Sequence, residues 1–403
     1  MPRRLERRDL LRFGALGGAW AGLSAPALAQ GPGSSPVADT ARRPAAPPDE
    51  SDPAADSTVR FTGDGLSLTP RQYAHILGSL VRSGVAADSY ILGGVVEELE
   101  SRMAALLGKE RAIFMPTGTL ANHLAIRALA DGRGRAVVQA ESHIYLDSGD
   151  CVQTLSGVTL MPLAPGRAAF TAEDLQHLLD QNRTGRVATR IGVVSLESPV
   201  RRMRGQIVDP AERDAIVALA RREGIRLHLD GARLFLEAAY ARLSVAEYAR
   251  LFDTVYVSLY KYFNAPFGAI LAGPHDLLDG MFHVRRMFGG GLYEAWPAAV
   301  VALHYLDGFD DRFRRAIGVS EELGRRLGAD GRFTVTREPR GTNLMRLTVK
   351  TQDPQAYRQR LLARGVALGA PAANGTFLLA TNETLNRAAA EPLAQAFTES
   401  LSA

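Results

Sequence analysis

The stretch IRLHLDGAR at residues 225–233 decides the fold. Its mainly apolar run ends at Asp230, and Gly231 follows directly. A second stretch, TVYVSLYKYFNAP at residues 254–266, places Lys261 just beyond its own apolar run. Short apolar runs that end in turn residues are typical of strands buried on both faces of a sheet. Both stretches therefore predict a strand with a polar side chain at or just past its carboxyl end.

Strands and helices alternate outward from this pair. Further strands are predicted at 111–115, 136–138 and 191–196, and helices at 93–107, 120–129, 210–223 and 296–306. Strands separated by helices argue for a mainly parallel sheet covered on both faces. From residue 307 the expected order is helix, strand, helix, strand, helix, with the clearest strands at 346–349 and 376–380. We therefore expect an α/β protein with a large domain over 58–306 and a small C-terminal α/β domain over 307–403.

The N-terminal residues are expected to be a targeting signal rather than part of the fold. Residues 6–12, ERRDLLR, resemble the twin-arginine export signal,. A mildly apolar run and the small-x-small sequence ALA at 27–29 follow, as before a signal cleavage site,. We expect a signal peptide over 1–29, a disordered Pro- and Ala-rich linker over 30–57, a periplasmic location, and membrane contact only through the signal. The alternative is an uncleaved anchor.

Charge and cysteine content exclude some classes of function. The formal net charge is +4, and five arginines against two acidic residues within 1–29 account for most of it. The remainder is nearly neutral and shows no basic stripe with interleaved aromatics, so we expect no nucleic-acid partner. Cys151 is the only cysteine, so no internal disulfide can form. No metal site is expected.

Several polar groups follow predicted strands, where ligands bind in sheets of this kind. They are Asp230, Lys261, His143 and the turn Thr117-Gly118-Thr119. Each suits one part of pyridoxal phosphate (PLP). A lysine among apolar neighbours can form a Schiff base with the aldehyde, and a carboxylate keeps the pyridine nitrogen protonated. A Gly-Thr turn before a helix offers amides to phosphate, and an imidazole can stack on the ring or move protons.

Singly these signals are weak, but their order resembles the threonine aldolase and β-eliminating lyase family of fold-type-I PLP enzymes. The resemblance covers about residues 60–350. The matching stretches are 109–122, 142–145, 228–234, the segment around Lys261, and RRMFGGG at 285–291.

The resemblance implies a role for each matching residue. Lys261 is the Schiff-base lysine, Asp230 the partner of the pyridine nitrogen, and His143 the stacking group. Gly118 and Thr119 hold the phosphate, and Arg233 lies near the ring oxygen or the substrate carboxylate. The resemblance also implies a homodimer or homotetramer with sites at the interface, where residues 286–291 approach the neighbouring site.

The sequence departs from the family at substrate-facing places. A Ser near the fold's start is replaced within TGD at 62–64, and a His after the strand ending at Glu197 is replaced within SPV at 198–200. Tyr260 stands where a small hydroxyl residue is usual, and residues 376–382 lack the expected Arg. The arginines just beyond residue 200 could supply a replacement cation, or they could be solvated loop residues. They are Arg201, Arg202 and Arg204.

The expected function is that of a PLP-dependent lyase acting on a β-substituted or β-hydroxy α-amino acid. Lys261, His143 and Asp230 are the expected catalytic residues, and the reaction is retro-aldol Cα–Cβ cleavage or β-elimination. A racemase or transaminase reaction is the first alternative, because the same carbanion leads to all of these. A PLP-binding protein without turnover is the second.

Overall fold

The computed structural model describes residues 56–132, 134–187 and 189–401. The predicted signal peptide and nearly all of the predicted linker lie outside the described residues. Within the described ranges, no helix is both long and apolar enough to cross a membrane.

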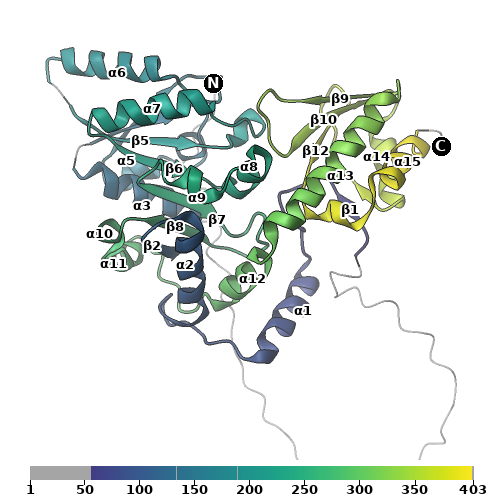
Figure 1. The fold of residues 1–403 in the computed structure, drawn as a ribbon, viewed down its shortest axis with the longest axis horizontal. Coiled ribbons are helices and arrows are strands. Elements are labelled where there is room, and N and C mark those ends of the chain that lie inside the picture. The colour runs from purple at the N-terminus through teal and green to yellow at the C-terminus, as the bar shows by residue number, and fades with distance from the viewer. Residues whose placement is uncertain (1–55, 133, 188, 402–403) are drawn as a thin grey trace, which may run out of the picture. The chain divides into compact units, whose positions relative to one another are not determined.

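A seven-stranded sheet forms the centre of the large part (Figure 1), in the order β2-β8-β7-β6-β5-β3-β4. β8 runs antiparallel to both of its neighbours, and the other pairs in the sheet are parallel. The predicted α/β fold with a mainly parallel sheet is therefore confirmed. The strands are β2 Arg111–Met115, β3 Arg135–Gln139, β4 Thr159–Leu163, β5 Ile191–Glu197, β6 Arg226–Asp230, β7 Thr254–Ser258 and β8 Ala269–Gly273.

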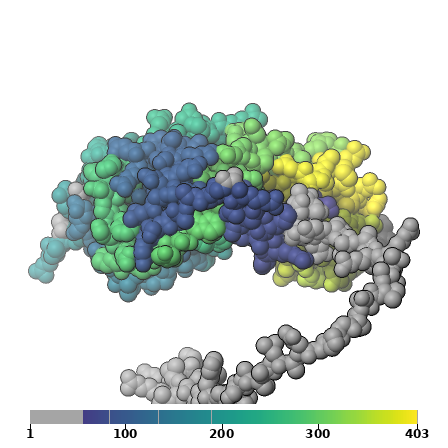
Figure 2. Space-filling view, turned by 90° about the horizontal axis from the view of Figure 1, so that it is seen from below, coloured from purple at the N-terminus to yellow at the C-terminus, as the bar shows by residue number. Residues whose placement is uncertain are grey.

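Helices cover both faces of this sheet. They are α1 Pro70–Leu80, α2 Gly94–Leu107, α3 Gly118–Ala130, α4 His143–Leu146, α5 Cys151–Ser156, α6 Ala172–Thr184, α7 Pro210–Arg222, α8 Leu234–Ala241, α9 Val245–Ala249, α10 His275–Leu278, α11 Met281–Met287 and α12 Trp296–Leu306. Both α1 and α2 pack against α12, which follows them by about two hundred residues in the sequence. Figure 2 shows the early residues, in purple and blue, bordering green residues of the second half of the chain.

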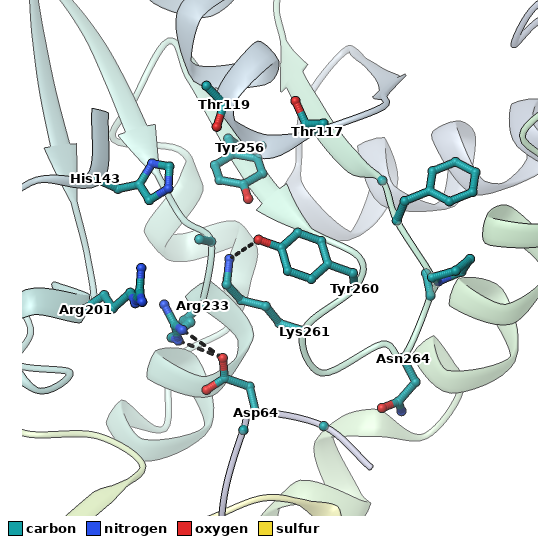
Figure 3. A pocket seen from close by; sticks show the side chains of 18 of the residues that line it. Asp64, Thr117, Thr119, His143, Arg201, Arg233, Tyr256, Tyr260, Lys261 and Asn264 are labelled. Atoms are coloured by element: carbon teal, nitrogen blue, oxygen red, sulfur yellow. Dashed lines mark hydrogen bonds and ion pairs between the residues drawn. The ribbon is translucent and has the colours of Figure 1, made fainter. Parts of the chain in front are cut away.

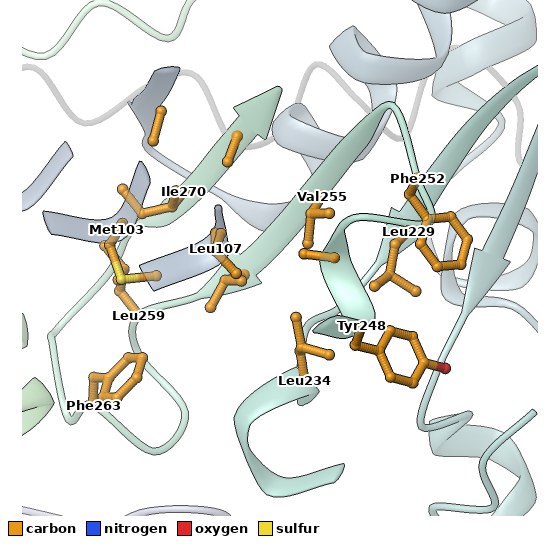
Figure 4. Close-up of a cluster of buried hydrophobic side chains, with 14 of the residues drawn as sticks. Met103, Leu107, Leu229, Leu234, Tyr248, Phe252, Val255, Leu259, Phe263 and Ile270 are labelled. Carbon is orange, nitrogen blue, oxygen red and sulfur yellow. The ribbon is translucent and has the colours of Figure 1, made fainter. Parts of the chain in front are cut away.

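Alternation along the strands divides the core between the two faces. Val255 and Val257 of β7 join the cluster that contains Met103 and Leu107 of α2, as Figure 4 shows for Val255. Tyr256, between them, joins the opposite cluster with residues of α3. Successive side chains of a strand point to opposite faces, so this register aims Tyr256 at the beginning of α3.

The C-terminal part has its own sheet and its own core. An antiparallel sheet has the order β12-β10-β9, and a short parallel pair joins β1 to β11. The strands are β1 Val59–Arg60, β9 Phe333–Arg337, β10 Leu344–Val349, β11 Val366–Ala367 and β12 Thr376–Ala380, and the helices are α13 Phe309–Ala329, α14 Pro354–Ala363 and α15 Ala390–Glu399. Short 3-10 turns complete the elements at Val81–Ser83, Arg201–Met203 and Glu383–Arg387.

Two details differ from the expected element order. β9 pairs with β10 in an antiparallel arrangement, where the sequence predicts β10 alone. Phe333 and Val335 are the residues of β9 that pack against the second core. Val59 and Phe61 pack in the second core, although they precede the large sheet in the sequence. The boundary near residue 307 stays a prediction, because Phe309 of α13 packs in the first core and Leu323 in the second.

Candidate active site

A pocket of about 860 Å³ lies where the parallel strands end. β5 ends at Glu197, β6 at Asp230 and β7 at Ser258, on one edge of the sheet. The pocket is lined by every residue that the sequence predicts for the site, namely Lys261, Asp230, His143, Gly118, Thr119 and Arg233. Figure 3 shows Lys261, His143, Thr119 and Arg233 around a common space. The fold thus brings together groups that are far apart in the chain.

Lys261 is held from behind by buried aromatic residues. Tyr262 and Phe263, which follow it, are fully buried in the large core. Its Nζ lies 3.4 Å from the Tyr260 hydroxyl and 4.8 Å from the centre of that ring. Burial, followed by the positive charge of Arg233, lowers the pKa of Lys261. A lowered pKa increases the fraction of neutral amine, which is the form that attacks an aldehyde.

Asp230 is fixed by a chain of buried hydrogen bonds. Asn122 Nδ2 donates to its Oδ2 at 2.5 Å, and Asn122 Oδ1 lies 2.9 Å from Nε2 of His228. An amide oxygen only accepts, so this His228 nitrogen carries a proton and Nδ1 accepts from the Thr254 hydroxyl at 2.8 Å,. Burial lowers the pKa of His228 to about 3, so the ring is neutral at ordinary pH. The chain therefore orients Asp230 without cancelling its charge.

Glu197 is a site residue that the sequence does not single out. It pairs in register with Asp230 across β5 and β6, and it is buried at the pocket wall. Its carboxylate accepts the His143 amide at 2.6 Å and the Arg201 amide at 2.9 Å. Burial, and then the charge of Asp230, raise the pKa of Glu197. Glu197 thus joins the two loops that carry His143 and Arg201.

The start of α3 forms a cradle for an anion. Thr117 caps the helix by accepting from the Leu120 amide at 3.1 Å, and the first intrahelical bond runs from the Ala121 amide to the Thr117 carbonyl. The amides of Gly118 and Thr119 precede that bond and can donate to a ligand. A Cβ on Gly118 would lie 2.0 Å from the Tyr256 hydroxyl, so no larger residue fits here. This close approach brings a phenol to the same cradle.

Arg233 is already bound to a carboxylate within the protein. Its Nε and Nη2 lie 3.0 and 2.9 Å from Oδ2 of Asp64, and Asn343 contacts the other Asp64 oxygen at 3.3 Å. A Cβ on Gly65 would lie 2.2 Å from the Lys261 carbonyl oxygen, so glycine is what allows the Asp64 segment to approach. Asp64 is a further pocket residue that the sequence does not single out as part of the site.

The donor set fits PLP. The pocket volume lies within the range of cofactor sites,. It combines an amine of lowered pKa, an oriented carboxylate, free helix-start amides and an imidazole, as the aldehyde, ring nitrogen, phosphate and ring face of that cofactor require. Among the described residues, no cluster of His, Cys, Asp and Glu could hold a metal ion.

Known proteins resemble the chain in sequence and in fold. A low-specificity L-threonine aldolase from Candida albicans is 31% identical over 212 residues, which are 52% of this chain and 56% of the relative. An alanine racemase from Cochliobolus carbonum is 31% identical over 226 residues, 55% of this chain and 57% of the relative. The chain thus spans about half the length of these curated relatives.

A solved structure extends the resemblance to nearly the whole fold. It is a putative aromatic amino acid β-eliminating lyase/threonine aldolase from Exiguobacterium sp. 255-15. It is 25% identical with a TM-score of 0.74, covering 86% of this chain and 98% of that one. The family model described as beta-eliminating lyase matches residues 84–352, which include every predicted site residue. The chain therefore belongs to the β-eliminating lyase family of fold-type-I, PLP-dependent enzymes.

Proposed function

We propose that the protein is a PLP-dependent lyase that cleaves a β-hydroxy or β-substituted α-amino acid. The observation that carries this is the meeting of Lys261, Asp230 and the start of α3 in one pocket. The threonine aldolase and β-eliminating lyase relatives support the same reaction class. A small amino acid is the proposed substrate, because several relatives are named as threonine aldolases.

Each residue has a task that its position supports. When bound, PLP supplies an electron sink for the bond that breaks at the substrate's Cα or Cβ. Lys261 Nζ would hold the cofactor covalently, and once the substrate amine had taken its place there, the freed lysine amine would be able to move a proton at the substrate, aided by its lowered pKa,. Asp230, held by Asn122, would keep the ring nitrogen protonated. The amides of Gly118 and Thr119 would hold the phosphate, and His143 would cover the ring or accept a proton.

Racemisation is the second candidate. The relative named alanine racemase favours it. Racemisation needs a proton removed on one face of Cα and returned on the other, so it requires acid-base groups on opposite sides of the substrate.

Product analysis over a panel of amino acids separates these reactions. We expect glycine plus an aldehyde for retro-aldol cleavage, or a keto acid plus ammonia for elimination. Inversion of L-alanine without carbon products would replace the lyase assignment by a racemase. Unchanged substrates across the panel, with PLP bound, would leave a binding protein.

We also propose that the protein forms a homodimer or homotetramer. Two segments, residues 90–92 and 287–293, meet through a backbone hydrogen bond from Tyr90 to Tyr293, and their exposed apolar side chains are here called the aromatic patch: Tyr90, Leu92, Met287 and Tyr293. The rings of Tyr90 and Tyr293 meet edge to face at 5.4 Å, and Arg286 lies 4.8 Å from the Tyr90 ring centre. Exposed apolar groups of this kind mark interaction surfaces.

Export to the periplasm is proposed from the sequence of residues 1–29 alone. Sequencing the N-terminus of protein recovered from the periplasm tests it. A start near residue 30 is expected, whereas full-length protein retained in the cytoplasm would contradict export.

A further inference from the structure

Three arginines follow β5 in the loop at 201–204, and two of them are engaged by carboxylates. Arg202 reaches Asp147 with Nε at 3.1 Å and Nη2 at 2.5 Å. Arg204 reaches Glu338 with Nε at 2.6 Å and Nη2 at 3.3 Å. Each of these two guanidinium groups therefore uses two nitrogens to bind a carboxylate of the protein itself.

Arg201 differs from both in where it points. It lines the pocket, and Figure 3 shows it extending toward His143 and Arg233. Within the described residues, its ion pair is a 3.9 Å separation from Asp147, longer than a hydrogen bond, and Asp147 is already bound by Arg202,. Its side chain is 60% exposed, so its charge faces the open pocket.

The backbone of Arg201 is nevertheless held in place by hydrogen bonds. Its amide donates to Glu197, whose other oxygen accepts the His143 amide. Val200, just before it, is fully buried and exchanges backbone hydrogen bonds with Gln206 and Gly205. A positively charged side chain on a fixed backbone, next to His143, is suited to orienting a substrate.

The pocket's other arginine is less available. Arg233 contacts Asp64 through two nitrogens, so its charge is largely balanced by the protein. An α-amino acid brings a carboxylate that loses much of its hydration on entering the pocket and needs an opposite charge.

We propose that Arg201 binds the α-carboxylate of the amino-acid substrate. The proposal rests on the proposed function, because it assumes an amino acid at the bound cofactor. It makes Arg201 a specificity-determining residue, and it selects substrates with an unmodified carboxylate next to Cα.

Titration of the holoenzyme with glycine tests this, since glycine has no other carboxylate. The readout is the change in the bound cofactor's visible absorption, which measures binding without turnover. Arg201→Ala is expected to weaken glycine binding by roughly ten- to a hundredfold, the range for one charge-assisted hydrogen bond. Arg201→Lys keeps the charge without the fork and should bind glycine with intermediate affinity.

Arg204→Ala is the matched control, because Arg204 lies in the same loop and is occupied by Glu338 rather than by Asp147. It should bind glycine like the wild type. Glycinamide provides a second arm: it should bind the wild type weakly, and Arg201→Ala should not weaken it further.

Wild-type affinity for glycine in Arg201→Ala would overturn the proposal while leaving the lyase assignment intact. Weakened binding of aspartate but not of glycine would also overturn it, because Arg201 would then bind a side-chain carboxylate. A wild-type holoenzyme whose absorption responds to no amino acid would overturn the proposed function as well.

Discussion

At the scale of single residues, the site depends on how Asp230 is supported. Its carboxylate would otherwise lie buried beside Glu197, its register partner, at a cost in free energy,. Asn122 and the Ala232 amide each donate to one of its oxygens, and neutral His228 fixes the orientation of Asn122. A chain of buried hydrogen bonds of this kind is hard to predict from sequence. Asn122 nevertheless lies one helical turn after Gly118, and that spacing places both residues on the same face of α3,.

Replacing Asp230 by Asn tests this support and the role in the cofactor's chemistry. The side chain keeps its size but loses the negative charge, so the ring nitrogen would no longer be held protonated. We expect the rate of the lyase reaction to fall by about a hundredfold or more, with the unfolding midpoint little changed. The measurement is steady-state turnover of PLP-saturated protein. A near-normal rate would count against the electron-sink role of Asp230.

The single residues that sequence reasoning predicted best are those at strand ends. Lys261, Asp230 and His143 were expected to converge because parallel strands present their carboxyl ends at one edge, and the pocket brings them together,. Glu197 follows the same rule at the end of β5 but was not singled out. The pairing of Arg233 with Asp64 joins positions 169 residues apart, and no local pattern predicts it.

At the scale of elements, regular apolar patterns were predicted well. β2 has the expected bounds, and α2 begins one residue after the predicted start. β8 was not predicted, because its sequence, AILAG, is short and closely follows the Lys261 segment. It runs antiparallel beside β7, so the expected alternation of strand and helix does not predict it. β9 was missed although its sequence, FTVTR, alternates apolar and polar residues as a half-buried edge strand does,.

Glu237, in the first turn of α8, provides a test at this scale, since it is a buried carboxyl. It is 1% exposed and accepts a hydrogen bond from Ser198 Oγ at 2.7 Å. Burial raises its pKa from 4.5 to about 7. Between these values the unfolded chain ionises while the folded protein keeps the proton. The free energy of unfolding therefore falls as pH rises through this window, and the loss is complete above pH 7.

Glu237→Gln removes that loss, because the amide does not ionise. We expect the variant to gain stability over the wild type between pH 5 and pH 8 by on the order of 3 kcal/mol, at about 1.4 kcal/mol per pH unit. Urea unfolding of both proteins at the two pH values measures the difference. Parallel pH dependence in the two proteins would show that Glu237 is ionised in the folded state.

At the scale of the whole molecule, the proposed oligomer requires a surface on which two copies of the chain can meet. A pocket at the strand ends can be completed by a neighbouring chain, and the aromatic patch offers an apolar surface. The sequence alone does not predict this surface, because Tyr90 and Tyr293 come together only in the folded chain.

Met287→Glu tests the patch, because it places a charge on a side chain that is 66% exposed. If the patch is buried between subunits, the variant should dissociate toward monomers and lose most activity. Light scattering after size exclusion measures the mass. Leu362→Glu, at another exposed apolar residue, is the control and should keep the wild-type mass. A wild-type monomer with full activity would refute the proposed oligomer.

The covalent attachment of PLP is tested most directly by borohydride reduction followed by peptide mass mapping. The chain has three lysines, Lys109, Lys261 and Lys350. Burial also lowers the pKa of Lys109, to about 8, but its Nζ donates to the Phe252 carbonyl outside the pocket, which makes it an internal control. We expect one pyridoxyl group per chain, on Lys261, and none in Lys261→Ala. Label on Lys109 or Lys350 instead, or a colourless protein that takes up no added cofactor, would contradict the assignment.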